Sequence, residues 1–391
     1  MDKTVELPEK KPAAMTSRQR VLTALHHEEP DRVPIQVDFT PEAAEKISTH
    51  LGLSDATVEA YTGEISDLPI ALGHDLLVAW HGIATSFYAV DDAPEYTCEW
   101  GLRWRWVDIP GGRYTEVVGR PLEDERRLDS YACPDPTESW RYEAARKLVR
   151  EHGNTHAIVG AMPCTTFEGA WYLRGFDRFM VDLAVNRDFA NKLLGKLYEF
   201  QLVTGTTLAE IGVDIIWMGD DFGTQASLLM SPEMWREFFK PLYAQLIGAF
   251  KDVNPEVKIA YHSDGNIEPL LPEFIEVGVD ILNAVQPKAM DPAHLKKRFG
   301  QNLCFWGTVD IQEVLPFGTP EDVEQEVERR IRTVGPGGGL ILGPSHNIQP
   351  DTPLENILAF YRAVEKHGYY LGYANSTTCM DEKREKTASG E

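Results

Sequence analysis

The sequence predicts an α/β fold, specifically a (β/α)8 TIM barrel with an antiparallel hairpin inserted in its N-terminal part. Strand-length apolar runs alternate with amphipathic stretches along the chain. Most of these runs are continuously apolar, as parallel strands buried on both faces are. No Gly-rich dinucleotide turn follows the first run, which disfavours an open doubly wound sheet. A length of 391 residues suits one such barrel with insertions, or two ordinary domains.

Seven runs have the length and composition of buried strands. They are 33–37, 157–160, 214–218, 257–261, 280–285, 303–306 and 340–342. A short repeated pattern, IGVDI at 211–215 and VGVDI at 277–281, predicts two places where a helix ends and a strand follows directly. Repeated strand–helix units of this kind indicate an α/β fold.

Five amphipathic stretches open with a capping residue followed by proline. A Ser, Thr or Asp side chain accepts hydrogen bonds from the first turn, and proline lacks an N–H that would be unpaired there. Four of the stretches end on glycine, which suits a left-handed closing residue. The predicted starts are Pro41, Pro232, Pro292, Pro320 and Pro353, and the predicted ends are Gly52, Gly300, Gly335 and Gly368.

Residues 85–122 break this rhythm. Aromatic and polar residues alternate from Tyr96 to Val107, and a Pro-Gly-Gly turn at 110–112 precedes a second such run. This pattern is typical of an antiparallel hairpin. An insertion this early in the barrel either walls the barrel mouth or is a surface ornament.

The two ends of the chain have the composition of solvated segments. Residues 1–16 are expected to be a flexible lead-in without the apolar region of a signal peptide, and residues 371–391 a flexible tail. The barrel domain is therefore predicted to span 17–370.

Composition excludes several classes of function. The chain has 61 acidic and 38 basic residues, so its net charge of −23 disfavours binding to nucleic acid. No run of about 18 apolar residues is present, so no membrane partner is expected. The five cysteines are widely spaced without a CxxC pair, which makes a disulfide framework unexpected and favours a reducing, cytoplasmic location.

Polar residues follow strand after strand, and in a parallel barrel all such residues gather at one rim, where barrel enzymes keep their active sites. Each of them alone could equally be a helix cap or a solvated loop residue. The strand exits are Asp38, Cys164, Asp220-Asp221, His262-Ser263-Asp264, Asn283, Gln286, Thr308, Asp310 and Ser345-His346-Asn347. Of the residues at or near the strand ends, Asn283, Gln286, Trp306 and Asp310 are the candidates for substrate binding.

A metal site is one interpretation of this rim. His262 and Asp264 stand at positions i and i+2, which project to the same side of extended backbone, and His346 follows the last predicted strand. Two imidazoles and a carboxylate suit Zn²⁺ or Fe²⁺ with open positions, where the metal would act as a Lewis acid. The metal-free alternative is equally physical: one histidine is a general acid that a carboxylate orients.

Three carboxylates are further catalytic candidates. Asp220 and Asp221 are adjacent, so only one can point inward on a regular strand, and the other would be a cap or a supporting partner. Two close carboxylates in a dry site raise one pKa and provide a general acid. Glu168 opens the helix that follows Cys164, where it either faces the pocket or complements the helix dipole.

Several motifs resemble those of the uroporphyrinogen decarboxylase superfamily, which includes corrinoid-dependent methyltransferases that act on methylcobamide proteins. The resemblance runs from about Ser17 to Gly368 and implies a (β/α)8 barrel with its pocket at the C-terminal rim. Its carriers are SRQRVLTAL at 17–25, PDRVP at 30–34, GDDFG at 219–223, LMSPEMW at 229–235, HSDGN at 262–266, FWGTVD at 305–310, and PSHNI at 344–348 with Asn356.

The resemblance separates two branches of this superfamily. The decarboxylase branch carries an early Arg-Gln-Ala-Gly-Arg segment whose arginines hold the carboxylates of a tetrapyrrole. The matching stretch here is RVPIQVDF at 32–39, which has no arginine pair. A polyanionic substrate needs such bidentate partners, so porphyrinogen decarboxylation is disfavoured.

The branch that methylates a thiol uses His-x-Cys and a distant Cys on zinc. The matching positions are His262, Asp264 and His346, so both cysteines are replaced and the set is better suited to oxygen or nitrogen substrates. The resemblance therefore implies a methyltransferase that moves a methyl group between a methoxylated or N-methyl small molecule and a corrinoid protein. The partner would supply the corrinoid, and Zn²⁺ is a second candidate cofactor. His346, Glu168 and Asp220 or Asp221 would activate the leaving heteroatom.

Two other functions stay open. A decarboxylase acting on a tetrapyrrole or another carboxylic acid would need no partner protein, and a non-catalytic binding barrel would not need so many acids and imidazoles at the rim. Whether the chain forms a homodimer is also left open by the sequence.

Overall fold

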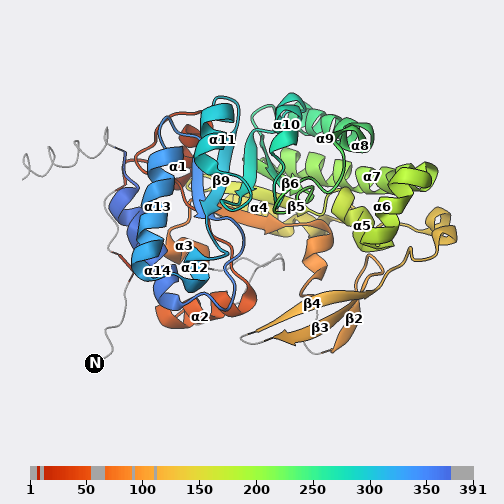
Figure 1. Cartoon of the computed structure of the whole chain (residues 1–391), viewed down its shortest axis with the longest axis horizontal. Coiled ribbons are helices and arrows are strands. Elements are labelled where there is room, and N and C mark those ends of the chain that lie inside the picture. Colours follow the sequence, from red (N-terminus) through yellow and green to blue (C-terminus); the bar gives the residue numbers. More distant parts are fainter. Residues whose placement is uncertain (1–6, 9–12, 54–66, 90–92, 110–111, 371–391) are drawn as a thin grey trace, which may run out of the picture.

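The computed structural model describes residues 7–8, 13–53, 67–89, 93–109 and 112–370. Its centre is a seven-stranded parallel sheet with the order β1-β5-β6-β7-β8-β9-β10 (Figure 1). The strands are β1 (Leu76–Trp80), β5 (Ala157–Pro163), β6 (Ile215–Gly219), β7 (Lys258–His262), β8 (Ile281–Val285), β9 (Cys304–Val309) and β10 (Leu340–Pro344). Because every neighbouring pair is parallel, the carboxyl ends of all seven strands lie at one rim.

Residues 33–39 close the curled sheet into a barrel. The backbone N–H of Gln36 donates to the carbonyl of Leu342 in β10, and the N–H of Asp75, just before β1, donates to the carbonyl of Ile35. This segment therefore bridges the two edge strands in the position of an eighth strand. The predicted (β/α)8 barrel is confirmed.

The prediction of a regular strand at 33–37 is wrong. The segment makes an isolated parallel bridge between Ile35 and Leu342 instead of a continuous ladder. Pro34 has no N–H to donate, and the side chain of Asp75 takes the N–H of Ile35 at 2.8 Å, so two ladder hydrogen bonds are lost. The other six predicted strands are confirmed. β1 was not among the predicted strands. Its apolar run follows the apolar helix α3 (Leu68–Leu72) almost directly, so the change from helical to strand periodicity in the sequence is hidden.

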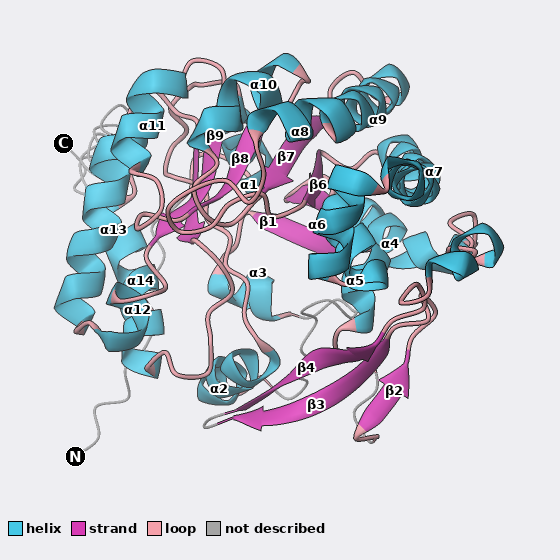
Figure 2. Cartoon of the chain, turned by 45° about the vertical axis from the view of Figure 1, so that its right-hand side comes forward, coloured by secondary structure: helices cyan, strands magenta, loops and turns pink. Residues whose placement is uncertain are grey.

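Helices surround the sheet (Figure 2). The remaining ones are α1 (Ser17–Leu25), α2 (Pro41–Leu51), α4 (Glu143–His152), α5 (Phe167–Arg174), α6 (Phe176–Val185), α7 (Arg187–Ile211), α8 (Pro232–Phe238), α9 (Lys240–Val253), α10 (Leu271–Glu276), α11 (Pro292–Phe299), α12 (Val314–Phe317), α13 (Pro320–Val334) and α14 (Leu354–His367). Short 3₁₀ helices span Gly82–Ser86, Glu125–Ser130, Ser139–Tyr142 and Glu268–Leu270.

All five predicted helices are present. Four begin at the predicted proline, and α14 begins one residue after Pro353. Gly52 has a φ of 68° and is the left-handed closing residue that was expected. Gly300, Gly335 and Gly368 stay right-handed, because each N–H still bonds to the carbonyl four residues earlier and the last turn simply continues.

The barrel interior is a core of its own. Helix α1 closes the N-terminal end of the barrel with Val21 and Leu25, which pack with the inward side chains of the strands. Arg20 of the same helix is buried between Asp31 and Asp75, with N–O distances of 2.6 Å to each. The N-terminal end of the barrel interior is thus closed by apolar packing and paired charge.

The predicted insertion is an antiparallel sheet with the order β2-β3-β4. It consists of β2 (Glu95–Thr97), β3 (Arg103–Ile109) and β4 (Gly112–Gly119), so the predicted hairpin is confirmed and a third short strand joins it. The turn residues 110 and 111 lie outside the described residues. Figure 2 shows this sheet apart from the barrel sheet and next to α2. The N–H of Arg113 in β4 donates to the Glu42 carboxylate of α2 at 3.0 Å, which ties the insertion to the barrel rim.

The predicted flexible ends fall largely outside the described residues, since 1–6, 9–12 and 371–391 are not described. Within the described part of the lead-in, Ala14 and Met15 donate their N–H groups to Asp31. Across the described residues, no helix combines the length and apolar character needed to cross a membrane. The four cysteines of the described ranges carry free thiols, and Cys379 lies outside those ranges.

Candidate active site

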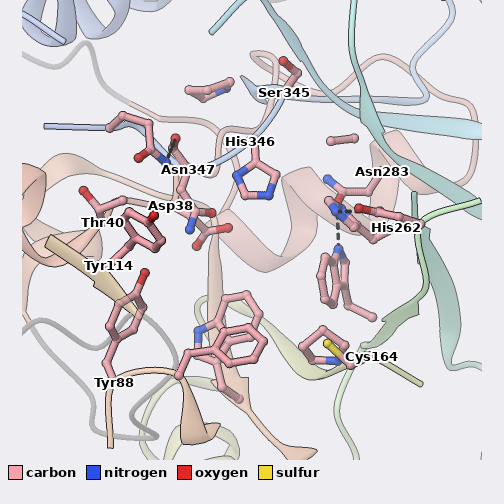
Figure 3. A pocket seen from close by; sticks show the side chains of 18 of the residues that line it. Asp38, Thr40, Tyr88, Tyr114, Cys164, His262, Asn283, Ser345, His346 and Asn347 are labelled. Atoms are coloured by element: carbon pink, nitrogen blue, oxygen red, sulfur yellow. Dashed lines mark hydrogen bonds and ion pairs between the residues drawn. The ribbon is translucent and has the colours of Figure 1, made fainter. Parts of the chain in front are cut away.

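A cavity of about 430 Å³ opens at the carboxyl ends of the strands (Figure 3). Strand ends supply one part of its wall, and the insertion and α2 supply another. Side chains from the strand ends include Trp80, Pro163, Trp217, His262, Asn283, Trp306 and Pro344, and those from the insertion and α2 include Ile109, Arg113, Tyr114 and Glu42. The insertion is therefore a wall of the cavity and not a surface ornament.

Six of the sequence-predicted site residues line this cavity: Glu168, Asp221, His262, Asn283, Trp306 and His346. Asp264 lies beside it within reach of the two histidines. Asp220, Gln286 and Asp310 do not line the cavity. Their side chains accept hydrogen bonds from backbone N–H groups instead.

His262, Asp264 and His346 form a cluster of three potential metal ligands. One donor atom from each lies within 4.8 Å of the other two, and the two imidazole centroids are 5.8 Å apart. His262 Nε2 is 3.9 Å from Asp264 Oδ1. Ligands of a tetrahedral Zn²⁺ at about 2.1 Å stand about 3.4 Å apart, so the cluster would close by about an ångström around an ion.

Two further observations fit a cation at this cluster. Asp264 Oδ1 is buried and accepts no hydrogen bond within the described residues, so its lone pairs are open to a ligand. Burial lowers the pKa of His346, which favours the neutral imidazole that binds metals. A buried carboxylate oxygen without a partner is costly, and a bound cation would offset that cost.

Asn283 fixes which nitrogen of His262 faces the cluster. Its Oδ1 accepts a hydrogen bond from Trp217 Nε1 at 2.9 Å and lies 2.7 Å from His262 Nδ1. An indole N–H can only donate, so the atom that it meets is the amide oxygen. His262 Nδ1 must therefore carry a proton, and Nε2 is the ring nitrogen that faces Asp264 and Asp221. This is the second-layer support that metal-binding imidazoles commonly have.

Close packing of two backbones places His262 at the rim. β6 and β7 pair through Gly219 and His262. A Cβ at Gly219 would lie 2.2 Å from the His262 carbonyl oxygen, so only glycine permits this approach. Gly219 at the end of β6 is therefore required for the close packing that positions His262 in β7.

Asp221, and not Asp220, faces the cavity. Its Oδ1 is 3.8 Å from His262 Nε2 and accepts the N–H of Asp264 at 2.7 Å. Asp220 is fully buried and accepts the N–H groups of Thr166 and Glu168, at the start of α5. Asp220 therefore anchors α5, and Asp221 is the member of the pair that can reach a substrate.

Glu168 lines the cavity among other acidic side chains. Burial raises its pKa well above the usual value, and the nearby carboxylates of Asp221, Asp220 and Asp264 raise it further. Its carboxyl group therefore keeps its proton to a higher pH than an ordinary glutamate does. A protonated carboxyl in a cavity is a general acid.

Gln286 and Asp310 each stabilise a loop at the rim by accepting a backbone hydrogen bond. Gln286 Oε1 accepts the N–H of Gly265 at 2.7 Å, which holds the turn after Asp264. Asp310 accepts the N–H of Gln312 at 2.7 Å, in the turn after β9. Both side chains are buried.

Some cavity residues were not among the predicted site residues. Asp38 was recognised only as a strand exit, although its position after the first apolar run gave the same signal as the others. Burial raises its pKa to about 6. Trp80 comes from the unpredicted strand β1, and Tyr88 and Tyr114 lie in or near the insertion, where no periodic signal indicates which side chains face the barrel.

The chain belongs to the uroporphyrinogen decarboxylase family. The family described as "Uroporphyrinogen decarboxylase (URO-D)" matches residues 106–367, which is more than half of the sequence. The barrel, its rim cavity and the strand-end residues agree with the fold expected from that resemblance.

Relatives within the family include both decarboxylases and methyltransferases. A uroporphyrinogen decarboxylase of Trichodesmium erythraeum is 25% identical over 64% of this chain and 70% of its own length. A methylcobamide:CoM methyltransferase of Methanosarcina barkeri is 24% identical over 90% of this chain and 98% of its own. A solved methyltransferase from Methanosarcina mazei shares the fold, with a TM-score of 0.66 and 22% identity over 90% of this chain and 99% of that one.

The cluster predicts stoichiometric metal binding. After equilibration with Zn²⁺ and removal of excess metal, the wild-type chain should hold about one ion, and His262→Ala and His346→Ala should each lose most of it. The reason is that two ligands cannot satisfy a site built for at least three protein donors. Elemental analysis provides the readout.

His294→Ala is the matched control, because His294 pairs with Glu268 outside the cavity and its loss should leave zinc content unchanged. Equal and negligible zinc in all four proteins would remove the metal site.

Proposed function

We propose that this chain is a corrinoid-dependent methyltransferase that moves a methyl group between a methoxylated or N-methyl small molecule and a corrinoid protein. The observation that carries the proposal is the convergence of His262, Asp264 and His346 at a rim cavity that Glu168 also lines. The near full-length similarity to a methylcobamide:CoM methyltransferase supports it. The corrinoid would be brought by a partner protein docking at the barrel mouth.

Breaking a methyl–oxygen or methyl–nitrogen bond requires activation of the leaving heteroatom. A metal ion held by His262, Asp264 and His346 would supply Lewis-acid polarisation of that atom. Glu168, whose pKa is raised by burial and by neighbouring carboxylates, would donate a proton to an oxygen or nitrogen leaving group. The methyl acceptor would be the low-valent cobalt of the corrinoid, which the partner brings.

The chain's own residues also position the substrate and exclude water. The insertion lies over one side of the cavity, where Ile109 and Tyr114 add apolar surface. Asn283 and Trp217 hold the His262 ring in one orientation. A fixed geometry of this kind lowers the entropic cost of an in-line transfer.

Decarboxylation of a tetrapyrrole is the alternative that the family raises. The observed cavity offers little support for it, because Arg113 is the one arginine or lysine among the described lining residues. Gln36 and Asp38 occupy the strand exit where the decarboxylase branch would provide arginines. A substrate with several carboxylates would meet carboxylates instead of bidentate cations.

The direct test mixes the zinc-loaded protein with a reduced corrinoid protein and a panel of methoxylated and N-methyl compounds. The cobalt absorption should shift with at least one compound, and His346→Ala should slow the shift by about a hundredfold or more. His294→Ala should behave like wild type. Release of CO₂ from a carboxylic acid, with no cobalt response to any compound, would contradict the proposal.

The raised pKa of Glu168 predicts a pH dependence. The carboxyl group loses its proton, and the methyl-transfer rate falls, as pH rises through that raised pKa. Glu168→Gln should slow transfer by about 10²–10⁴-fold and remove this alkaline limb. The measurement is the pH–rate profile of both proteins with one substrate. An unchanged alkaline limb in Glu168→Gln would assign the general acid elsewhere.

A further inference from the structure

We infer that the small molecule that gives up its methyl group is an aryl methyl ether, a compound with its methoxy group on an aromatic ring. The inference deepens the proposed function and rests on it, since it names the class of substrate bound at the same site. It follows from the rings that line one side of the cavity and from the chemistry that the leaving atom needs.

One side of the cavity is built from partly exposed aromatic rings. Phe87, Tyr88, Tyr114 and Tyr172 all line it, and all four side chains keep solvent-accessible surface. Tyr114 is 42% exposed. In Figure 3, Tyr88 and Tyr114 lie across the cavity from His262. These four rings are named the aromatic wall, and a planar ligand ring gains stacking contacts against such a surface.

The rings of the aromatic wall are held in place by their own packing. The ring centroids of Phe87 and Tyr172 are 5.6 Å apart, and Tyr172 stacks on Trp171 with centroids 4.1 Å apart. Tyr88 stacks on Trp106 at 5.8 Å. A surface whose side chains are already fixed loses little conformational entropy when a ligand binds to it.

Helix α5 connects the aromatic wall to the acid. Glu168 and Tyr172 are four residues apart in this helix, so they lie on the same helix face, and both line the cavity. A ring that lies against Tyr172 therefore has its substituent beside the Glu168 carboxyl group. The cavity volume of about 430 Å³ suits a compound with one ring, because it lies near the lower end of the ~300–1,000 Å³ that ligand pockets span.

The leaving atom must carry a lone pair. The metal that His262, Asp264 and His346 would hold and the proton of Glu168 both act on such a pair. An ether oxygen keeps its lone pairs at neutral pH. An alkyl amine, with a pKa near ~10 as in lysine, is protonated there and offers no lone pair. The site chemistry therefore favours an O-methyl compound over an N-methyl one.

An aryl ether needs less activation than an alkyl ether. The methyl–oxygen bond breaks, the oxygen keeps the electron pair and takes the Glu168 proton, and the methyl group bonds to the electron pair of Co(I) in the partner's corrinoid. The products are a phenol, an ionised Glu168 and the methylated corrinoid. A phenol has a pKa of about 10, whereas that of water, which alcohols resemble, is about 15.7, so a phenol is the better leaving group.

Calorimetric titration of the zinc-loaded chain, without any corrinoid protein, tests the recognition of the ring. The probes are anisole and methoxycyclohexane, which share the methoxy group and differ in whether the ring is aromatic. Anisole should bind at least about threefold tighter, because only a flat ring stacks on the aromatic wall. A smaller preference, or tighter binding of methoxycyclohexane, would overturn the inference.

Tyr172→Leu tests the aromatic wall directly. Leucine keeps apolar bulk, so the affinity for anisole should fall about two- to tenfold while that for methoxycyclohexane stays the same. Tyr114→Leu, at an exposed position, should change the affinities in the same direction and decides the matter if Tyr172→Leu does not fold. Phe317→Leu, 77% exposed on α12, is the matched control and should leave both affinities unchanged. Unchanged anisole binding in the folded tyrosine variants would overturn the role of the wall.

The cobalt assay tests the leaving atom. Anisole should shift the cobalt absorption at pH 7, and N,N-dimethylbenzylamine, which has the same ring but a protonated nitrogen, should shift it at least about tenfold more slowly. An equal or faster response to the amine would contradict the preference for oxygen.

The inference and the proposed function fail in different ways. Selective binding of anisole with no cobalt response to any compound contradicts the proposed function and leaves the aromatic binding site standing. Methyl transfer from an alkyl ether or an amine, at a rate equal to or above that from anisole, contradicts the inference and leaves the proposed function standing.

Discussion

The site depends on one oxygen atom, Oδ1 of Asn283. It accepts a hydrogen bond from the Trp217 indole and another from His262 Nδ1. Because the indole can only donate, the identity of this atom is fixed, and with it the tautomer of the imidazole. The same oxygen thus holds the Trp217 ring in place and turns Nε2 of His262 toward the cluster. The parallel register of β6, β7 and β8 brings these three side chains together.

The carboxylates at this rim differ in their hydrogen-bond partners, and these partners determine what each carboxylate can do. Asp220 is saturated by donors from the start of α5 and is structural. Asp264 Oδ1 has no hydrogen-bond partner among the described residues and lies beside two imidazoles, which suits a metal, and burial together with neighbouring acids raises the pKa of Glu168. Asp38 also lines the cavity, where it accepts a hydrogen bond from Gln36 Nε2. The groups around each carboxylate, and not its residue type, therefore distinguish the structural Asp220 from the acids that the proposal uses.

Much of this arrangement could be predicted from the sequence, because a parallel barrel turns strand ends into a common rim. His262, Asp264 and His346 were placed together on that ground alone. The choice between Asp220 and Asp221 could not be made, since it depends on where the Thr166 amide lies. The bonds of Asn283 were equally hidden, because they depend on the register between strands. The regular strand expected at 33–37 failed because the side chain of Asp75 competes for a ladder hydrogen bond, a contact between residues distant in sequence.

X-ray absorption at the zinc edge of the metal-loaded chain tests the central claim, that two imidazoles and one carboxylate converge on a single ion. The account predicts nitrogen and oxygen scatterers alone at about 2.0–2.1 Å, with the multiple-scattering signature of two imidazoles. A sulfur scatterer at about 2.3 Å, or a spectrum without imidazole features, would contradict it.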